Sequence, residues 1–241
     1  MTRLPMNRTG LMMAATMLAS FTVAADAQTR RPALPMAVSD NWGTRIEARD
    51  SGHVLGNPEA DNRLVEYMSY TCSHCAEFAR TGDAAIKLLV VPRGKVSFEI
   101  RHLLRDPIDL TATLLTHCGE TDKFLRNHHA IISRQAEWLA AAKATSQAQR
   151  TRWNFGTNIA RRRAIASDLG FYAIMEARGY SRAKIDQCLS DEAKANVLAE
   201  ATQRDVAALG LEGTPSFVLD GKLLDGVHSW EALQPVLAKL D

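Results

Sequence analysis

The sequence predicts an α/β fold in which one sheet is interrupted by an all-helical segment. Three observations indicate this fold. An apolar run at residues 63–70 is followed by helical periodicity and by an alternating run at 96–100, which together make a strand–helix–strand unit. Helical spacing then fills residues 106–209. Two short strand-like runs and a last helix follow, so the order is βαβ, helices, ββα.

The N-terminus has the three-part layout of a secretory signal peptide. A short basic segment ends at Arg8, an uncharged apolar run follows from Leu11 to Ala24, and Ala25-Asp26-Ala27 is a small-residue cleavage site. We therefore expect residues 1–27 to be removed near Ala27–Gln28, with an uncleaved membrane anchor as the alternative. Residues 28–50 are predicted to be a flexible lead-in, because proline, arginine and alanine dominate their first part.

The first part of the predicted sheet lies in residues 51–105. His53-Val54-Leu55 is expected to form a short strand that ends in a turn at Gly56. Residues 63–70 are almost continuously apolar, which is typical of a strand covered on both faces. Residues 75–91 carry apolar side chains at helical spacing, and the alternating run 96–100 is expected to return as a parallel strand.

The helical segment contains several stretches in which apolar residues recur at helical spacing. They are residues 109–115, 123–132, 136–142, 160–169 and 171–177. The last helix is expected to start at Ser190-Asp191-Glu192, which supplies a capping hydroxyl and two acids. Gly210 is placed to end this helix.

The remaining residues complete the predicted sheet. The runs 216–219 and 222–224 are separated by Asp220-Gly221, a pair that favours a tight β-hairpin turn. Ser229 then precedes a last helix that is expected to run to about Leu240.

Cys72-Ser73-His74-Cys75 directly follows the first long strand and starts the helix after it. Two cysteines separated by two residues at such a junction indicate a redox pair rather than a structural disulfide. The free N–H groups and the dipole of the helix N-terminus stabilise a thiolate there, and the thiolate is the species that exchanges disulfides. The sequence therefore predicts thiol–disulfide chemistry.

Other chemistries fit the sequence less well. The formal net charge of +2 argues against a nucleic-acid partner, and the cluster Arg161-Arg162-Arg163 is expected to be a solvated helix face. Ala76 follows the second cysteine where covalent haem attachment needs a histidine. A zinc site would lack a second close cysteine pair, and no glycine-rich phosphate loop accompanies the βαβ unit. We therefore expect no metal and no small-molecule cofactor.

The chain resembles the DsbA family of exported thiol–disulfide oxidoreductases. The resemblance rests on the run from Leu64 to Cys75, on the helical segment and on Gly213-Thr214-Pro215-Ser216-Phe217. It implies a thioredoxin-like fold formed by residues 51–105 and 210–241, with residues 106–209 as an all-helical insert. It also implies a cis peptide bond before Pro215 that places Thr214 and Pro215 against the two cysteines, where an extended substrate can bind.

The resemblance also implies roles for the site residues. Cys72, exposed at the helix start, would form the mixed disulfide with a substrate, and the more buried Cys75 would resolve it. His74 would donate toward the Cys72 thiolate. Glu66 would accept or deliver the proton of Cys75, although a carboxylate that faces solvent or pairs with an arginine is an alternative. Family members often have proline before the histidine, and Ser73 stands there in this chain.

Cys118 and Cys188 lie in the predicted insert. Exported proteins seldom leave two thiols free, and some relatives in the family carry a second, non-catalytic disulfide in the insert. This implies a Cys118–Cys188 bond. Two separately buried thiols and a second redox pair are the alternatives.

Taken with its resemblance, the sequence predicts a periplasmic protein that introduces disulfides into newly exported, cysteine-containing proteins. The family implies reoxidation by a membrane-embedded partner of the DsbB type. A reductase or disulfide isomerase of the same fold is one alternative. A non-catalytic holdase or binding module is another.

Overall fold

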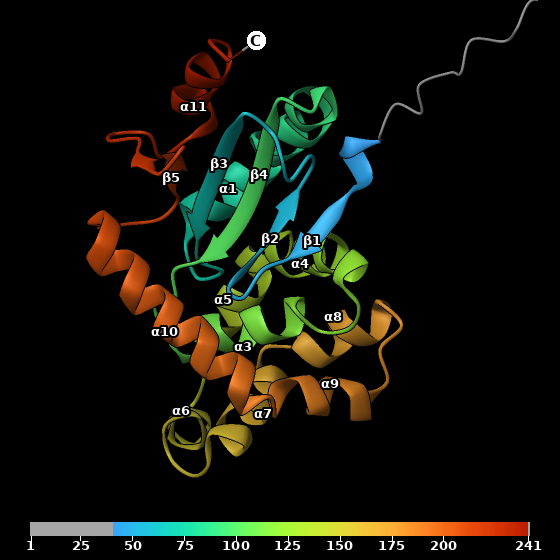
Figure 1. Cartoon of the computed structure of the whole chain (residues 1–241). Helices are drawn as coiled ribbons and strands as arrows, with labels where there is room; N and C mark the ends of the chain where they lie inside the picture. Colours follow the sequence, from blue (N-terminus) through green and yellow to red (C-terminus); the bar gives the residue numbers. More distant parts are fainter. Residues whose placement is uncertain (1–40, 241) are drawn as a thin grey trace, which may run out of the picture. The chain divides into compact units, whose positions relative to one another are not determined.

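A computed structural model describes residues 41–240, so the predicted signal peptide and residues 28–40 of the lead-in lie outside the described part. Within it, a six-stranded sheet has the order β1-β2-β4-β3-β5-β6 (Figure 1). The strands are β1 (Ile46–Ala48), β2 (Gly52–Leu55), β3 (Asn62–Met68), β4 (Val96–His102), β5 (Ser216–Leu219) and β6 (Lys222–Leu223). The predicted α/β fold with a helical insert is confirmed.

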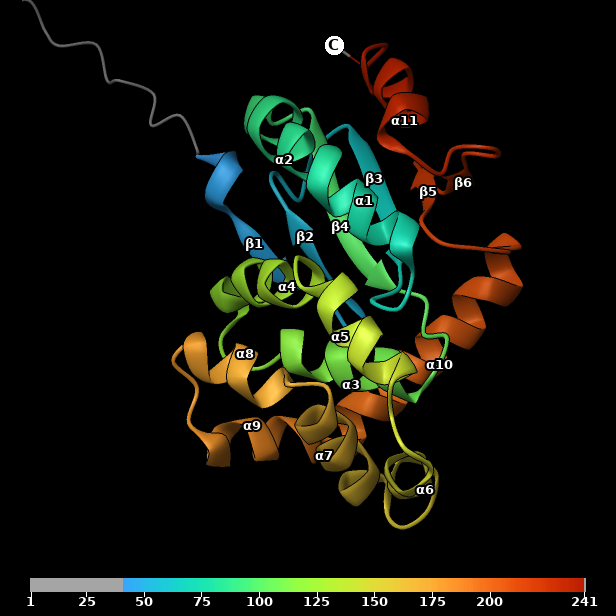
Figure 2. The same cartoon turned by 180° about the vertical axis from the view of Figure 1, so that it is seen from behind.

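Strand β3 is central and is covered on both faces, as its apolar run predicts. It pairs parallel with β4 and antiparallel with β5. Because side chains alternate along a strand, Leu64 and Met68 join the main core on the face of α1 (Ser73–Thr81), and Glu66 lies between them. Val65 and Tyr67 face the other way and join a smaller core. Figures 1 and 2 show α1 on the opposite side of the sheet from α10 (Glu192–Leu209).

The lead-in prediction is wrong for residues 41–50. Residues Trp42–Thr44 form the 3-10 turn η1, and β1 pairs antiparallel with β2 as an edge strand. The Trp42 ring lies against Gly94, whose φ of 75° favours glycine, and a Cβ there would come within 2.8 Å of the ring. Strand β1 was not predicted because its segment is mostly polar and its side chains are at most partly buried.

The segment after the cysteines is a broken helix rather than one continuous helix over 75–91. Helix α1 ends at Gly82, which lies so close to Phe78 that an added Cβ would come within 2.5 Å of its ring. The short helix α2 (Asp83–Ala85), the π-helical turn η2 (Ile86–Val90) and the 3-10 turn η3 (Val91–Arg93) follow. Pro92 in η3 lacks the N–H that a longer helix would need.

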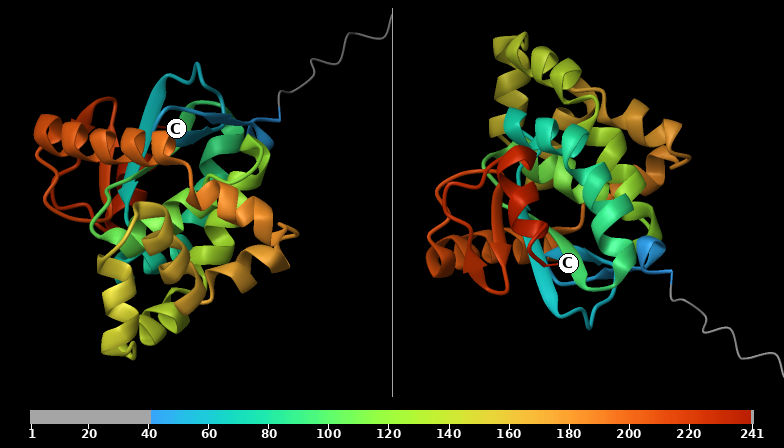
Figure 3. Two further views of the ribbon diagram at one scale, coloured as in Figure 1. Left: turned by 90° about the horizontal axis from the view of Figure 1, so that it is seen from below. Right: turned by 90° about the horizontal axis from the view of Figure 1, so that it is seen from above.

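The insert consists of helices throughout, as predicted. It also contains the 3-10 turn η4 (Thr121–Lys123). Two of its helices, α6 and α9, were not predicted from the periodicity of the sequence. Its helices are α3 (Pro107–Thr116), α4 (Phe124–Ile132), α5 (Gln135–Lys143), α6 (Gln147–Asn154), α7 (Asn158–Asp168), α8 (Phe171–Ala177), α9 (Arg182–Leu189) and α10. Figure 3 shows α6 and α7 at the margin of the insert farthest from the sheet.

Two expectations about the insert need correction. Asp191, not Ser190, caps α10, because its side chain accepts from the N–H of Lys194 while the Ser190 hydroxyl bonds back to Asp186 O. Arg162 is not part of a solvated face. It is buried and donates to the carboxylate of Glu192 at 3.0 Å.

The C-terminal part follows the prediction closely. Strands β5 and β6 form an antiparallel hairpin whose turn residues, Asp220 and Gly221, have φ values of 51° and 79°. Helix α11 (Trp230–Leu237) begins after Ser229, whose side chain accepts from Ala232 N. Gly210 ends α10 with a left-handed conformation, also as predicted.

The chain enters and leaves the insert at neighbouring points. The Thr202 hydroxyl of α10 donates to His102 O at the end of β4 and accepts from Leu104 N, both at 3.1 Å. One side chain of the last helix of the insert thus holds the backbone through which the chain enters the insert. Among the described helices, none combines the length and the apolar character that crossing a membrane requires.

Candidate active site

The two cysteines lie where the central strand of the sheet passes into α1. Strand β3 ends at Met68, and Cys72 is the N-cap of α1, with its carbonyl accepting from Ala76 N at 3.3 Å. Both cysteines are thiols, and Cys75 is less exposed than Cys72, at 1% against 5%. The prediction that Cys72 is exposed is wrong. The loop before β5 lies against its sulfur, and the Cys72 thiol donates to Thr214 O at 3.1 Å.

The surroundings of Cys72 favour its thiolate. Hydrogen bonding from the Cys75 side chain is the largest cause, and the Thr214 side chain and the backbone N–H groups of Cys75 and His74 add to it. Against the cost of burial, they lower the pKa of Cys72 from 9.0 to about 4. Burial, the hydrogen bond to Cys72 and the charge of Glu66 raise the pKa of Cys75 well above 9.0. The two thiols therefore differ strongly in acidity, which is the arrangement that directed disulfide exchange requires.

His74 contributes through its backbone rather than through its ring. Its side chain is exposed, and among the described contacts its ring makes no hydrogen bond to the Cys72 sulfur. The N–H of His74 is one of the groups that lower the pKa of Cys72. The residue therefore supports the thiolate, but the predicted donation from its ring is not seen.

Glu66 is buried behind the redox pair, at 4% exposure, which rules out the alternative of a solvent-facing carboxylate. Burial raises its pKa well above 4.5, and the charge of Asp83 adds to this effect. Its register partner on the neighbouring strand β4 is Ile100, so β4 places no basic residue directly beside it. Instead, Lys87 of η2, which pairs with Asp83 at 2.5 Å, supplies the opposing positive charge. A buried acid next to a high-pKa thiol can carry a proton to or from that thiol.

The loop before β5 completes the front of the site. The Thr214–Pro215 peptide bond is cis, as the resemblance implies, and Thr214 O lies beside the Cys72 sulfur. Ser216 Oγ donates to Gly213 O at 2.8 Å, and His228 Nδ1 lies 2.8 Å from Pro215 O. The loop is therefore held from both ends next to the reactive sulfur.

Three side chains of the insert reach this site, and sequence reasoning missed them. Asp109 accepts from Ser69 Oγ at 2.6 Å and from Tyr70 N at 2.8 Å. Asp106 accepts from Thr71 Oγ1 at 2.9 Å. Gln135, at the start of α5, donates to Tyr70 O and Cys72 O, both at 2.7 Å. The Asp106-Pro107 pair is a visible helix start, but nothing in the sequence indicates which loop these side chains contact.

Four histidines form a second cluster that the sequence did not reveal. His53 of β2, His102 of β4 and His128 of α4 are buried, and His117 after α3 is partly buried. Ring centroids lie 4.7 Å apart for His53 and His117 and 5.2 Å apart for His102 and His117. Burial is the largest cause that lowers the pKa of His53 to about 4 and of His102 to about 3. Tyr70 joins this cluster to the segment before Cys72, because its hydroxyl lies 2.9 Å from His128 Nδ1.

These histidines do not make a metal site. Nowhere in residues 41–240 do three or more histidine, cysteine, aspartate or glutamate side chains converge as metal ligands would. The cluster is therefore a packed aromatic group between the sheet and the insert.

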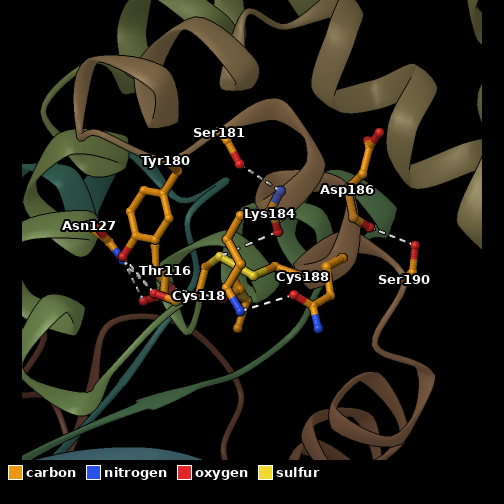
Figure 4. The surroundings of a disulfide bond; sticks show 11 residues. Thr116, Cys118, Asn127, Tyr180, Ser181, Lys184, Asp186, Cys188 and Ser190 are labelled. Atoms are coloured by element: carbon orange, nitrogen blue, oxygen red, sulfur yellow. Dashed lines mark hydrogen bonds between the residues drawn. A yellow bond between two sulfur atoms is a disulfide. The ribbon is translucent and has the colours of Figure 1, made fainter.

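The implied Cys118–Cys188 disulfide is confirmed, and it excludes the two alternatives of buried thiols and a second redox pair. The bond joins the end of α3 to α9, with the two Cα atoms 5.6 Å apart. Figure 4 shows Asn127 and Tyr180 beside it, and both donate to Cys118 O, at 3.0 and 2.7 Å. The disulfide lies within the insert and fixes its internal packing.

Comparisons with known proteins agree with this geometry. A family model described as Thioredoxin matches residues 48–239. The crystal structure of a protein-disulfide isomerase from Novosphingobium aromaticivorans is 45% identical, with a TM-score of 0.77, over 80% of this chain and 100% of that one. The structure of alpha-DsbA1 from Wolbachia pipientis has a TM-score of 0.60 at 21% identity, over 78% and 89% of the two chains, and confirms the predicted DsbA-like fold.

A Rickettsia conorii protein, named as a candidate protein-disulfide oxidoreductase, is 28% identical over 173 residues, which are 71% of this chain and 54% of that protein. The chain thus spans about half the length of the curated relatives it matches. The match of the family model extends over both parts of the sheet and the whole insert. The chain therefore belongs to the thioredoxin family, in the DsbA-like form in which a helical insert interrupts the sheet.

Proposed function

We propose that this chain is an exported thiol–disulfide oxidoreductase that donates its Cys72–Cys75 disulfide to newly exported proteins with free thiols. The observation that carries the proposal is the contrast between the two sulfurs. Cys72 has a pKa of about 4 at the start of α1, while the pKa of Cys75 behind it is raised. The names of the relatives from Rickettsia and Novosphingobium support the same class of chemistry.

The reaction proceeds in two exchanges. A client thiolate attacks Cys72 Sγ of the oxidised pair, which forms a mixed disulfide and releases Cys75 as a thiolate. A second client thiolate then attacks the client sulfur of that bond and releases the Cys72 thiolate. The client loses two electrons and gains a disulfide, and the pair becomes a dithiol. Cys72 is the better leaving group because its pKa is low.

Glu66 and the loop before β5 have supporting roles in this proposal. The Cys75 thiolate needs a proton when it is released, and Glu66 is the buried acid whose charge raises its pKa. Thr214 and Pro215 present a backbone edge beside Cys72, where an extended client segment can pair. The backbone N–H of His74 helps to stabilise the Cys72 thiolate.

The direction of exchange follows from which form of the pair is stabilised. A low pKa of Cys72 stabilises the reduced protein, and each pKa unit corresponds to about 30 mV in a two-electron couple. This favours a disulfide donor. The spent dithiol would be reoxidised by a membrane-embedded partner of the DsbB type, and the location would be the periplasm.

A disulfide isomerase is the second candidate, because the structure at 45% identity is named a protein-disulfide isomerase. An isomerase acts from the reduced form, so the Cys72 thiolate would attack a wrong disulfide of the client. The same geometry permits this attack. The two candidates therefore differ in the redox state in which the protein works.

The deciding experiment is the equilibrium of the Cys72–Cys75 pair with a glutathione buffer, read by thiol trapping. A reduction potential well above that of thioredoxin, about −270 mV, supports the donor. A value near or below it refutes the donor assignment. Parallel assays with a reduced client and with a scrambled, fully oxidised client then separate oxidase from isomerase. A wild-type protein that does not exchange, together with a Cys72→Ser variant that binds and protects clients equally well, would identify a holdase.

A further inference from the structure

Residues Ser69–Cys72, here called the redox loop, join β3 to α1 and carry the reactive sulfur. The redox loop belongs neither to β3 nor to α1, and side chains of the insert hold it by hydrogen bonds. Asp109 accepts from Ser69 Oγ and Tyr70 N, at 2.6 and 2.8 Å. Gln135 Nε2 donates to Tyr70 O and to Cys72 O, both at 2.7 Å.

Gln135 comes from a distant part of the chain. It is the first residue of α5 in the insert, is 63 positions from Cys72, and is 4% exposed. A buried amide that donates to two carbonyls satisfies Tyr70 O and adds a second donor at Cys72 O, and this fixes the loop tightly. The contact therefore connects the insert directly to the backbone of the reactive cysteine.

The position of Cys72 O matters because two donors share it. The second is Ala76 N, whose bond at 3.3 Å is the first helical hydrogen bond of α1. If Cys72 O moves, the Cys72 sulfur moves relative to the N–H groups of His74 and Cys75, which stabilise its thiolate. Gln135 thus acts on the sulfur through the backbone, without touching it.

We propose that Gln135 is a positioning residue through which the helical insert sets the thiolate stability of Cys72 and the redox equilibrium of the pair. The proposal deepens the function proposed above and rests on it. Through Gln135 the insert then influences disulfide exchange at Cys72, although no atom of the insert takes part in the exchange itself.

The test compares Gln135→Met, which keeps the length of the side chain and removes the donor, with Gln203→Met, the same change at an exposed position of α10. The pH midpoint of thiolate absorbance and the equilibrium constant with glutathione are measured for both. In Gln135→Met we expect the midpoint to rise by about one pH unit. The constant for reduction should fall about tenfold, which corresponds to about 30 mV. Gln203→Met should match the wild type.

A purely structural role would lower the unfolding temperature of Gln135→Met but leave its midpoint and its equilibrium constant unchanged, and that result overturns the proposal. Gln135→Asn, which keeps the amide but withdraws it by one methylene, should shift both quantities in the same direction. If neither variant folds, Gln135 serves the fold and the proposal is refuted. The midpoint needs no exchange reaction, so a wild-type protein that fails to exchange with glutathione refutes the proposed function separately.

Discussion

Replacing His102 with phenylalanine should make the protein more resistant to acid. His102 is 4% exposed at the end of β4, and neither of its ring nitrogens has a hydrogen-bond partner within residues 41–240. Its neighbours are the rings of Tyr70, His117 and Phe124, so an uncharged six-membered ring suits the same surroundings. Leaving a buried polar group unpaired costs about 1–3 kcal/mol, which His102→Phe should recover in part at pH 7.

The larger effect comes from linkage between protonation and folding. Burial, the largest cause, lowers the pKa of His102 from 6.5 to about 3 in the folded protein. Because the folded-state pKa is depressed, acid protonates the unfolded chain first. The contribution of His102 to the free energy of unfolding is therefore fully present above pH 6.5 and is lost as the pH falls toward 3. At about 1.4 kcal/mol per pKa unit, and with the unfolded histidine already half protonated at pH 6.5, acidification from pH 6.5 to pH 4.5 costs about 2 kcal/mol through this residue.

The assay is urea unfolding at pH 7 and at pH 4.5 for the wild type, His102→Phe and His129→Phe, a control on the exposed face of α4. His102→Phe should lose about 2 kcal/mol less than the wild type between the two pH values. Asp109 acts in the opposite sense, because its pKa is raised to about 7 by burial, and its protonation favours the folded state as pH falls. That contribution is common to all three proteins and cancels in the comparison.

The other charged groups near the cluster are Lys194 of α10, Lys87 of η2 and His129 of α4, which all keep the histidines neutral. They are unchanged in the variant. Equal losses of stability in the wild type and His102→Phe on acidification would refute the reasoning, as would protection of the same size in His129→Phe.

Three further outcomes are expected. Cys118→Ala combined with Cys188→Ala should lower the free energy of unfolding by about 4 kcal/mol, from the chain-entropy model for a separation of 70 residues, and leave the redox potential unchanged. A loss below about 1 kcal/mol in urea unfolding contradicts that model. Glu66→Gln should be more stable than the wild type at pH 7 but not below pH 4.5, because the raised pKa of Glu66 makes its ionisation costly only above 4.5. It should also form the mixed disulfide with a client more slowly, because the released Cys75 thiolate lacks its proton donor, as followed by quenched-flow thiol trapping, and equal rates would exclude Glu66 from the proton transfer. When incubated with a client that carries a disulfide, Cys75→Ala should accumulate that client joined to Cys72 on non-reducing gels, because the Cys72 thiolate opens the client disulfide and no Cys75 thiol is present to release it. Accumulation in Cys72→Ala instead would exchange the roles of the two cysteines.

The sequence was most informative where local chemistry decides the structure. The turn at Asp220-Gly221 and the caps at Ser229 and Gly210 depend on a few neighbouring residues, and all formed as predicted. It was less informative where packing decides. Nothing local distinguishes the edge strand β1 from a flexible lead-in, because its partner β2 and the Trp42–Gly94 contact supply the order.

The same division applies to the site. The redox pair and the Thr214–Pro215 loop carry short motifs, so they could be found along the chain. Asp109 and Gln135 lie 37 and 63 residues beyond Cys72 in ordinary helical sequence, and only the folded insert brings them to the loop. The burial of Cys72 was missed for the same reason, since the covering group is Thr214, 142 residues away.

The contact of Thr202 with both His102 and Leu104 has a mechanical consequence. The insert is connected to the sheet by two stretches of chain, and this one hydroxyl bonds the second stretch to the first. The insert is also held at other points of the same boundary, by Asp109 and Gln135 at the redox loop and by His128 at Tyr70. Sheet and insert share one continuous core as well. The Thr202 bonds therefore brace the two connections, while the other contacts keep the insert seated on the reactive end of the sheet.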